Sequence, residues 1–316
     1  MRYINPPPMI WLKLAFSLIL FAGVALLIWR RAPFWINRRF TPLGRFITVQ
    51  GAKVHYHQTG SGPDVILLHG ASGNLREWEF GLRAAVEGSY RVTAFDRPGH
   101  GYSDVIAGNA HLGHSAAHLR AAAEALGIKD FILVGHSYGG SVALAWALQA
   151  APRGLMLISS PSLPWPGRLD PWYRMNEIPI ISNILVRLAA ILVPMYYIEI
   201  AVRHVFAPGF VPPDYVRRMG LALTLRPRSM RANVAQVNAL LGDIRAQMAD
   251  YSHLKMPIEV IHGDRDIIVP AAIHSIPLAA TLPHAHLTLI SGAGHMPHHS
   301  HMDQVIAVLA RLCNPS

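Results

Sequence analysis

The sequence predicts an α/β fold whose sheet is mostly parallel and covered by helices on both faces. Short apolar runs bounded by turn residues recur along the chain and indicate buried strands. Helical patterns lie between most of these runs, as they do where helical crossovers join parallel strands. One interval, 162–250, breaks this alternation with prolines and apolar helical stretches. We interpret that interval as a helical lid inserted between two strands.

The predicted strands begin with a hairpin, in which residues 46–49 and 54–58 flank the turn Gly51-Ala52. The later strands are continuous apolar runs, typical of a sheet buried on both faces. These runs are 65–68, 92–95, 131–134, 155–158, 258–261 and 287–290. The helices expected to cover the sheet are 115–126, 141–150, 271–280 and 303–312.

Composition favours a folded protein with a substantial core. The chain has 316 residues, of which 52% are apolar and 15% charged, enough for one large or two small domains. Cys313 is the one cysteine, so an intrachain disulfide is excluded. We interpret Cys313 as a small, half-buried apolar residue rather than a catalytic thiol.

The net charge of +10 suits an anionic partner, either nucleic acid or a membrane surface. The sequence has neither a basic run with interleaved aromatics nor a nucleic-acid motif, so no nucleic-acid partner is expected. Part of the charge comes from Arg30, Arg31, Arg38 and Arg39, directly after an apolar stretch. Membrane lipid is therefore the expected partner.

That apolar stretch, residues 9–29, is interrupted by one charge, Lys13. As a helix it would span about 30 Å, the hydrocarbon thickness of a bilayer. Trp11 and Trp29 lie near its ends, where interfacial aromatics belong. We expect a transmembrane anchor over 1–32 and a linker over 33–44. A cleaved signal peptide and a buried core helix are the alternatives, but no clear A-x-A cleavage site precedes the arginines.

Positive residues flank the anchor more heavily on its C-terminal side, which places the catalytic domain in the cytoplasm by the positive-inside rule. A second apolar stretch, 178–200, contains Pro179, Arg187 and Pro194. We interpret it as part of the lid, lining an apolar pocket and contacting the bilayer, with a second membrane span as the alternative.

The strand 131–134 runs into Gly135-His136-Ser137-Tyr138-Gly139, which a helical pattern follows. Strand, G-x-S-x-G and helix together predict a sharp turn that lifts the Ser137 hydroxyl out of the sheet. The glycines are needed because bulky neighbours would clash with the strand and the helix. The Tyr138 amide would begin that helix and could donate a hydrogen bond to an oxyanion.

A serine nucleophile needs a base and an orienting carboxylate. His295 lies in a glycine-rich loop directly after the strand 287–290, so it is the candidate base among 18 histidines. Asp264 and Asp266 follow the strand 258–261 and compete for the acid. Asp266 lies further out on the loop, and Asp264 is expected to support it. The chain order Ser, Asp, His differs from the chymotrypsin and subtilisin orders.

The second oxyanion donor is expected in the loop after the early strand 65–68. His69 and Gly70 open this loop, and the backbone amide of Ala71 is the candidate donor. His69, Gly70 and His136 belong to these motifs and are expected to pack or hydrogen-bond near the site.

The chain resembles the α/β-hydrolase superfamily from about Gly44 to its C-terminus. The motifs are the His69-Gly70 loop, the segment 96–103 (DRPGHGYS), the turn at Ser137, the loop 263–270 and Gly294-His295. The resemblance implies an eight-stranded, mostly parallel sheet, with a core formed by 45–161 and 251–316. It also implies Asp266 as the acid, and Ala71 and Tyr138 as the oxyanion donors. One departure is Ser300, which stands where the family often has a glutamate.

A metal site is an alternative for the cluster His284, His286, His295, His298, His299 and His301. Its spacing matches no metal motif such as H-E-x-x-H on a helix, and a catalytic base explains His295 better. We therefore expect neither a metal nor a cofactor.

The predicted function is a serine hydrolase that cleaves a carboxylic ester, or a related acyl bond, of a small hydrophobic substrate. A carbon–carbon bond hydrolase or an acyltransferase could use the same triad. Ser137 disfavours relatives that place an aspartate at this turn, such as haloalkane dehalogenases and epoxide hydrolases. The alternative from another class is a catalytically silent, membrane-anchored binding protein on the same fold.

Overall fold

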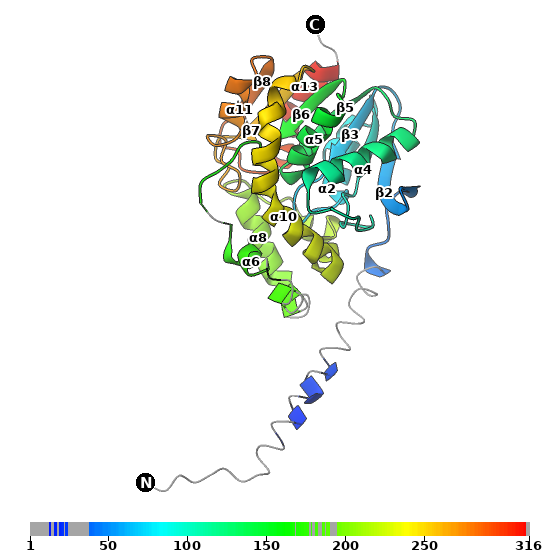
Figure 1. The fold of residues 1–316 in the computed structure, drawn as a ribbon, viewed down its shortest axis with the longest axis vertical. Helices are drawn as coiled ribbons and strands as arrows, with labels where there is room; N and C mark the ends of the chain where they lie inside the picture. The colour runs from blue at the N-terminus through cyan, green and yellow to red at the C-terminus, as the bar shows by residue number, and fades with distance from the viewer. Residues whose placement is uncertain are drawn as a thin grey trace.

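The computed structural model describes residues 38–313 apart from position 168 and parts of 177–194, together with a few positions between 13 and 24. It contains one sheet of eight strands (Figure 1). The strands are β1 (Arg45–Val49), β2 (Ala52–Thr59), β3 (Asp64–Leu68), β4 (Arg91–Phe95), β5 (Phe131–His136), β6 (Gly154–Ile158), β7 (Ile258–Gly263) and β8 (Ala285–Ile290).

The strands lie in the order β1-β2-β4-β3-β5-β6-β7-β8. β1 and β2 pair antiparallel, β2 pairs antiparallel with β4, and the pairs from β4 to β8 are parallel. The chain moves from β3 outward to β4 and then returns to the other side of β3 for β5. Such a reversal opens a crevice at the carboxyl ends of the strands, where open α/β sheets bind ligands.

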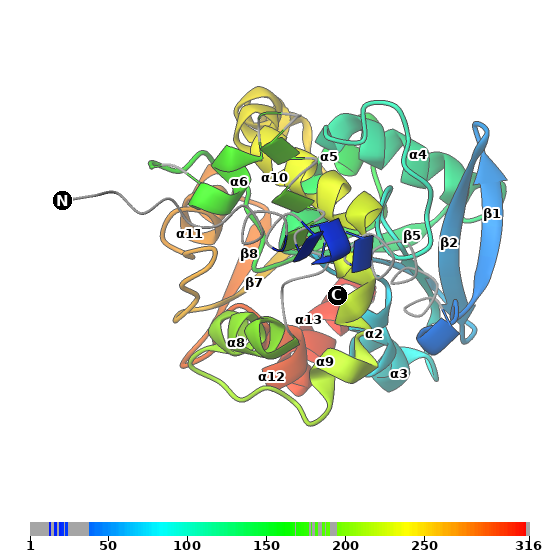
Figure 2. The ribbon, with the colours of Figure 1, turned by 90° about the horizontal axis from the view of Figure 1, so that it is seen from below.

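Helices cover both faces of the sheet, which Figure 2 shows as two layers with the strands between them. One face carries α4 (Leu112–Ala125), α5 (Tyr138–Gln149) and α11 (Ser275–Thr281). The other carries α2 (Arg76–Glu79), α3 (Leu82–Val86) and α13 (Met302–Cys313).

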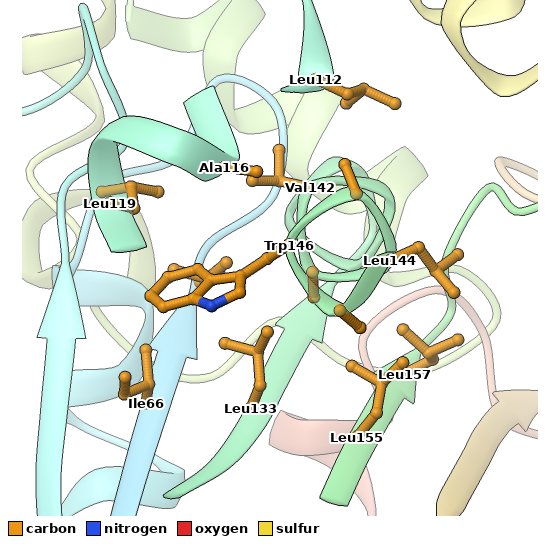
Figure 3. Close-up of a cluster of buried hydrophobic side chains, with 14 of the residues drawn as sticks. Ile66, Leu112, Ala116, Leu119, Leu133, Val142, Leu144, Trp146, Leu155 and Leu157 are labelled. Carbon is orange, nitrogen blue, oxygen red and sulfur yellow. The ribbon is translucent and has the colours of Figure 1, made fainter. Parts of the chain in front are cut away.

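Each central strand contributes side chains to two hydrophobic clusters, because successive side chains point to opposite faces of the sheet. Leu133 packs with Trp146 of α5 on one face, as Figure 3 shows, whereas Ile132 and Val134 pack with Trp78 on the other. The two tryptophans are fully buried. The parallel strands therefore read as continuous apolar runs in the sequence.

The segment between β6 and β7, which we call the lid, is helical. Its described elements are α6 (Pro171–Met175), α8 (Met195–Phe206), α9 (Tyr215–Arg218), η1 (Leu221–Leu225), α10 (Pro227–Gln247) and η2 (Met248–His253). In Figure 1, α6 and α8 lie at one end of the sheet, and α10 runs from that end back along the core. The structure describes the apolar stretch 178–200 only in part, because ten of its 23 positions lie outside the described residues.

The structure describes only eight of the 32 positions of the predicted anchor, 1–32, and it describes the predicted linker, 33–44, only from Arg38. Among the positions that the structure describes, none of the helices has the length and apolar character needed to cross a membrane.

Candidate active site

Ser137 lies at a strained turn between β5 and α5. Its backbone has φ +50° and ψ −124°, a conformation that residues other than glycine adopt only under strain. The flanking glycines make the turn possible. A Cβ on Gly135 would lie 2.5 Å from the Gly139 carbonyl oxygen, and a Cβ on Gly139 would lie 2.2 Å from the Leu68 oxygen. The turn has the sharp geometry that the motif predicts, and we call it the nucleophile turn.

The loop after β8, residues 291–296, carries His295 toward the loop after β7. His295 Nδ1 lies 2.8 Å from Asp266 Oδ2, and both side chains are buried. Asp266 Oδ1 accepts hydrogen bonds from the backbone amides of Ile268 and Val269, at 2.9 Å each. The structure therefore brings the candidate base and the candidate acid together, with the acid held by its own loop.

Electrostatics favour a charged acid and a neutral base at this contact. Burial alone would raise the pKa of Asp266, but hydrogen bonds from His262 and His295 keep it far below its usual value. Burial lowers the pKa of His295, although the Asp266 carboxylate opposes this shift. A neutral His295 that donates from Nδ1 to Asp266 keeps its Nε2 lone pair for a proton from a nucleophile.

Ser137 and His295 line the same cavity, which has a volume of about 430 Å³. Among the described residues, the Ser137 hydroxyl forms no hydrogen bond. Contacts between a nucleophile and its base are often long without substrate and tighten in the complex.

The loop after β3, residues 70–73, holds the candidate oxyanion donor Ala71 and passes beside Ser137, and we call it the oxyanion loop. A Cβ on Gly70 would lie 3.3 Å from Ser137 Cβ. The Ala71 amide makes no hydrogen bond to any residue that the structure describes. Tyr138 is the first residue of α5, so its amide has no acceptor within the helix. Ala71 lines the cavity, and Tyr138 directly follows Ser137 in the chain.

His69 and Arg97 hold the oxyanion loop in place. The Arg97 guanidinium donates to the carbonyl oxygens of His69 and Gly70, at 2.9 and 3.0 Å. His69 Nε2 accepts from the Arg97 amide at 3.0 Å, so its Nδ1 carries the proton and donates to the Gly70 oxygen. Burial and the charge of Arg97 lower the pKa of His69 to about 4, which keeps this imidazole neutral.

Asp264 supports the base loop through its backbone. Its carboxylate accepts a hydrogen bond from the Gly292 amide at 2.7 Å, and its own amide donates to the Ile290 oxygen at 3.1 Å. Ser300, at the position of the family glutamate, ends the short helix α12 (Pro297–Ser300) and bonds the Met296 oxygen at 3.2 Å.

Two side chains at the site were not predicted from the sequence. His262 Nε2 lies 3.0 Å from Asp266 Oδ2 and 2.7 Å from the Val269 oxygen, so the acid contacts a second histidine. Glu77, buried on α2, contacts His136 Nδ1 at 2.6 Å. The only sequence signal for His262 is its place at the end of β7, and Glu77 has none beyond lying seven residues after Gly70.

The six C-terminal histidines do not form one metal cluster. His286 is exposed on β8, whereas His298 is buried beside Glu77 and His136. Donor atoms of Glu77, His136 and His298 lie within 4.8 Å of one another, the one such group among the described residues. Two ligands of one tetrahedral zinc stand about 3.3 Å apart, from bond lengths near 2 Å. The 2.6 Å between Glu77 and His136 is instead a hydrogen-bond distance.

The lid forms the apolar wall of the cavity. Its apolar lining side chains from the lid are Ile198, Ala201, Val202, Val205, Phe206, Met219, Leu221 and Leu225, and the loops after β7 and β8 add Ile268 and Met296. The lid also reaches the oxyanion loop, because Asn233 of α10 accepts a hydrogen bond from the Ser72 amide at 2.7 Å. The cavity is therefore polar at the sheet edge and mostly apolar beneath the lid, where Tyr173, Tyr215 and Thr224 are its polar lining residues.

Residues 65–308 match the model of the alpha/beta hydrolase family. An uncharacterised protein of Mycobacterium tuberculosis is 26% identical over 279 residues, covering 85% of this chain and 81% of its own. The pimeloyl-[acyl-carrier protein] methyl ester esterase of Nitrosomonas europaea is 27% identical, covering 81% of this chain and 98% of its own. The crystal structure of Cfl2 from Burkholderia cenocepacia superposes with a TM-score of 0.71 at 22% identity, over 85% of this chain and 95% of that one.

Proposed function

We propose that this chain, which belongs to the alpha/beta hydrolase family, cleaves a carboxylic ester or a related acyl bond through Ser137, His295 and Asp266. The observation that carries the proposal is the convergence on one cavity. Ser137, at its strained turn, lines the same 430 Å³ space as His295, whose Nδ1 lies 2.8 Å from Asp266. A nucleophile, a base and an orienting acid in that arrangement are what acyl transfer requires.

In the proposed reaction, Ser137 Oγ attacks the acyl carbonyl while His295 Nε2 takes the hydroxyl proton. Asp266 stabilises the imidazolium that forms. The Ala71 and Tyr138 amides donate to the tetrahedral oxyanion, and each such donor is worth about 3 kcal/mol. His295 returns the proton to the leaving alkoxide, and a water activated by the same histidine then hydrolyses the acyl-enzyme. These steps use side chains and amides of the chain itself.

The proposed substrate is small and hydrophobic. Support comes from the lid side chains, which make the cavity wall opposite the sheet apolar. The esterase name of the Nitrosomonas europaea relative agrees with ester chemistry.

Labelling with a fluorophosphonate probe tests the proposal, because the probe reacts with activated serines. We expect wild-type protein to label and Ser137→Ala to lose the label. A folded wild-type sample that does not label would instead favour a silent binding protein. A circular dichroism spectrum of each sample controls for folding.

We propose further that residues 9–29 anchor the domain to a membrane, with the domain on the cytoplasmic side. Support comes from the apolar composition of this segment and from the four arginines that follow it. Fusion of a reporter that is active only in the periplasm to the C-terminus tests the orientation. Low reporter activity with membrane-bound protein is expected, and strong activity would overturn the orientation.

A further inference from the structure

Glu77 and His136 link the three segments that make the proposed active site. Glu77 Oε2 accepts the Gly70 amide of the oxyanion loop at 3.1 Å. Glu77 Oε1 lies 2.6 Å from Nδ1 of His136, the residue directly before Ser137. His136 Nε2 lies 3.1 Å from the carbonyl oxygen of His295. One carboxylate and one imidazole thus connect the oxyanion loop, the nucleophile turn and the base loop.

The contacts of His136 determine where its protons lie. A carbonyl oxygen only accepts, so the contact with the His295 oxygen requires a proton on Nε2 of His136. The short contact of Nδ1 with Glu77 requires a second proton, held either by the imidazole or by the carboxyl group. We infer the positions of the protons on His136 from these hydrogen-bond partners.

The contacts of Glu77 favour its ionised carboxylate. Burial alone would raise the pKa of Glu77, but the charge of His136 and hydrogen bonds with His136 and His298 hold this pKa well below its usual value. Glu77 also accepts the Gly70 amide, a bond that favours the ionised carboxylate. Burial lowers the pKa of the neighbouring His298, which contacts Glu77 through Nε2 at 3.4 Å. Of the two histidines, His136 makes the shorter contact with Glu77, at 2.6 Å.

We propose that Glu77 and His136 form a buried ion pair that positions the oxyanion loop and the base loop against Ser137. This inference rests on the proposed function and adds two positioning residues to it. Neither residue exchanges a proton with substrate. Their role is to fix Gly70, and with it the neighbouring Ala71 amide, relative to the backbone of His136 and His295.

The tight packing around the pair explains how it acts. A Cβ on Gly70 would lie 3.0 Å from His136 Nδ1, and a Cβ on Gly73 would lie 2.9 Å from Glu77 Oε2. The oxyanion loop therefore closes directly around the carboxylate and the imidazole. Without the pair, the loop loses an acceptor for Gly70, and the base loop loses a donor for the His295 oxygen.

Turnover per titrated active site tests the pair, because it separates positioning from the amount of folded protein. In Glu77→Ala we expect kcat to fall about 10- to 100-fold with KM changed less than about threefold, since small misplacements at a reacting centre cost this much. Glu77→Gln should recover most of the loss, because its amide can accept from Gly70 and donate to a neutral His136.

Glu79→Ala is the matched control on the same helix. Glu79 is as buried as Glu77 and binds His57 at 2.8 Å and Arg83 at 3.0 Å, away from the cavity. Its loss should lower stability but leave turnover per titrated site unchanged. The double variant Glu77→Ala/His136→Gln should lose no more than the worse single variant, because both residues act through one link. Turnover in Glu77→Ala equal to wild type would overturn the inference.

A nitrogen-15 spectrum of the histidines tests the ion pair without any activity. The His136 signals, identified by their loss in His136→Gln, should be those of an imidazolium at pH 7 and should become neutral in Glu77→Gln. A neutral His136 in wild type would contradict the pair even if the protein failed to label with the probe. Loss of wild-type activity on adding a chelator would favour a metal at Glu77, His136 and His298 and would also overturn it.

Discussion

At the residue scale, one oxygen of Asp266 contacts two histidines. Oδ2 lies 2.8 Å from His295 Nδ1 and 3.0 Å from His262 Nε2. His262 Nε2 also contacts the Val269 oxygen, so this nitrogen carries a proton and donates to both acceptors. Two histidines therefore share the negative charge of Asp266. As a result, Asp266 stabilises the protonated form of His295 less than it would if it contacted His295 alone.

This sharing predicts the acid limb of the pH–rate profile. His295 must be neutral to accept a proton, so activity rises with pH through its pKa. Burial lowers that pKa below the ordinary histidine value of 6.5. The acid limb of kcat/KM in wild type should accordingly lie below pH 6.5.

Removing His262 should move the limb upward. In His262→Leu, Asp266 loses a donor and stabilises the His295 imidazolium more strongly, so the pKa of His295 rises and the limb moves to higher pH. The position of the limb reports this even where total activity falls. His253→Leu, at an exposed histidine beside Asp250, is the control and should not shift it. A limb that stays in place in His262→Leu, or moves to lower pH, would count against shared charge.

The residues at this scale differ in how visible they are in the sequence. Ser137, Asp266 and His295 each follow a strand within a recognisable loop, and the structure brings their loops together. No such loop motif identifies Glu77 or His262 as a site residue. Glu77 meets His136 across 59 positions of sequence, and its role depends on a fold that brings α2 against β5.

At the element scale, the strands were predictable to within two residues at each end. Their apolar runs are continuous because both faces of the sheet are covered by packed helices. Helix starts were less predictable. α4 begins at Leu112, three residues before the expected position, and Asp243 of α10 accepts its first amide at 2.8 Å. Because this capping residue lies 131 residues away in the sequence, the residues around Leu112 give no local signal for the start of the helix.

The nucleophile turn explains the early start of α5. Its pattern was expected to begin at Ser141, but the helix begins at Tyr138. The turn of the chain at Ser137 leaves no connecting loop, so Gly139 and Gly140 are already helical. A Cβ on Gly140 would lie 1.8 Å from Ser160 Oγ, so glycine serves packing here although it weakens helices.

At the scale of the whole molecule, the loops at the sheet edge supply Ser137 and His295 to the cavity, and the lid supplies most of its apolar wall. The lid could be recognised in the sequence as a break in the strand rhythm. Which of its side chains face the cavity depends on how α8 and η1 pack over the sheet. Val205 lines the cavity, whereas Val211, also half-buried, lines a separate surface cleft beside Phe210.

This division of the cavity predicts chain-length selectivity. With p-nitrophenyl esters, kcat/KM should rise about fourfold for each methylene that enters the apolar part, from about 0.8 kcal/mol per buried CH₂, and then fall once the cavity is full. Val205→Phe adds a ring to the cavity wall and should move the optimum to shorter acyl chains. Val211→Phe adds the same bulk outside the cavity and should leave the optimum where it is. A steady decline from acetate upward in wild type, or an unchanged optimum in Val205→Phe, would mean that the acyl chain lies elsewhere.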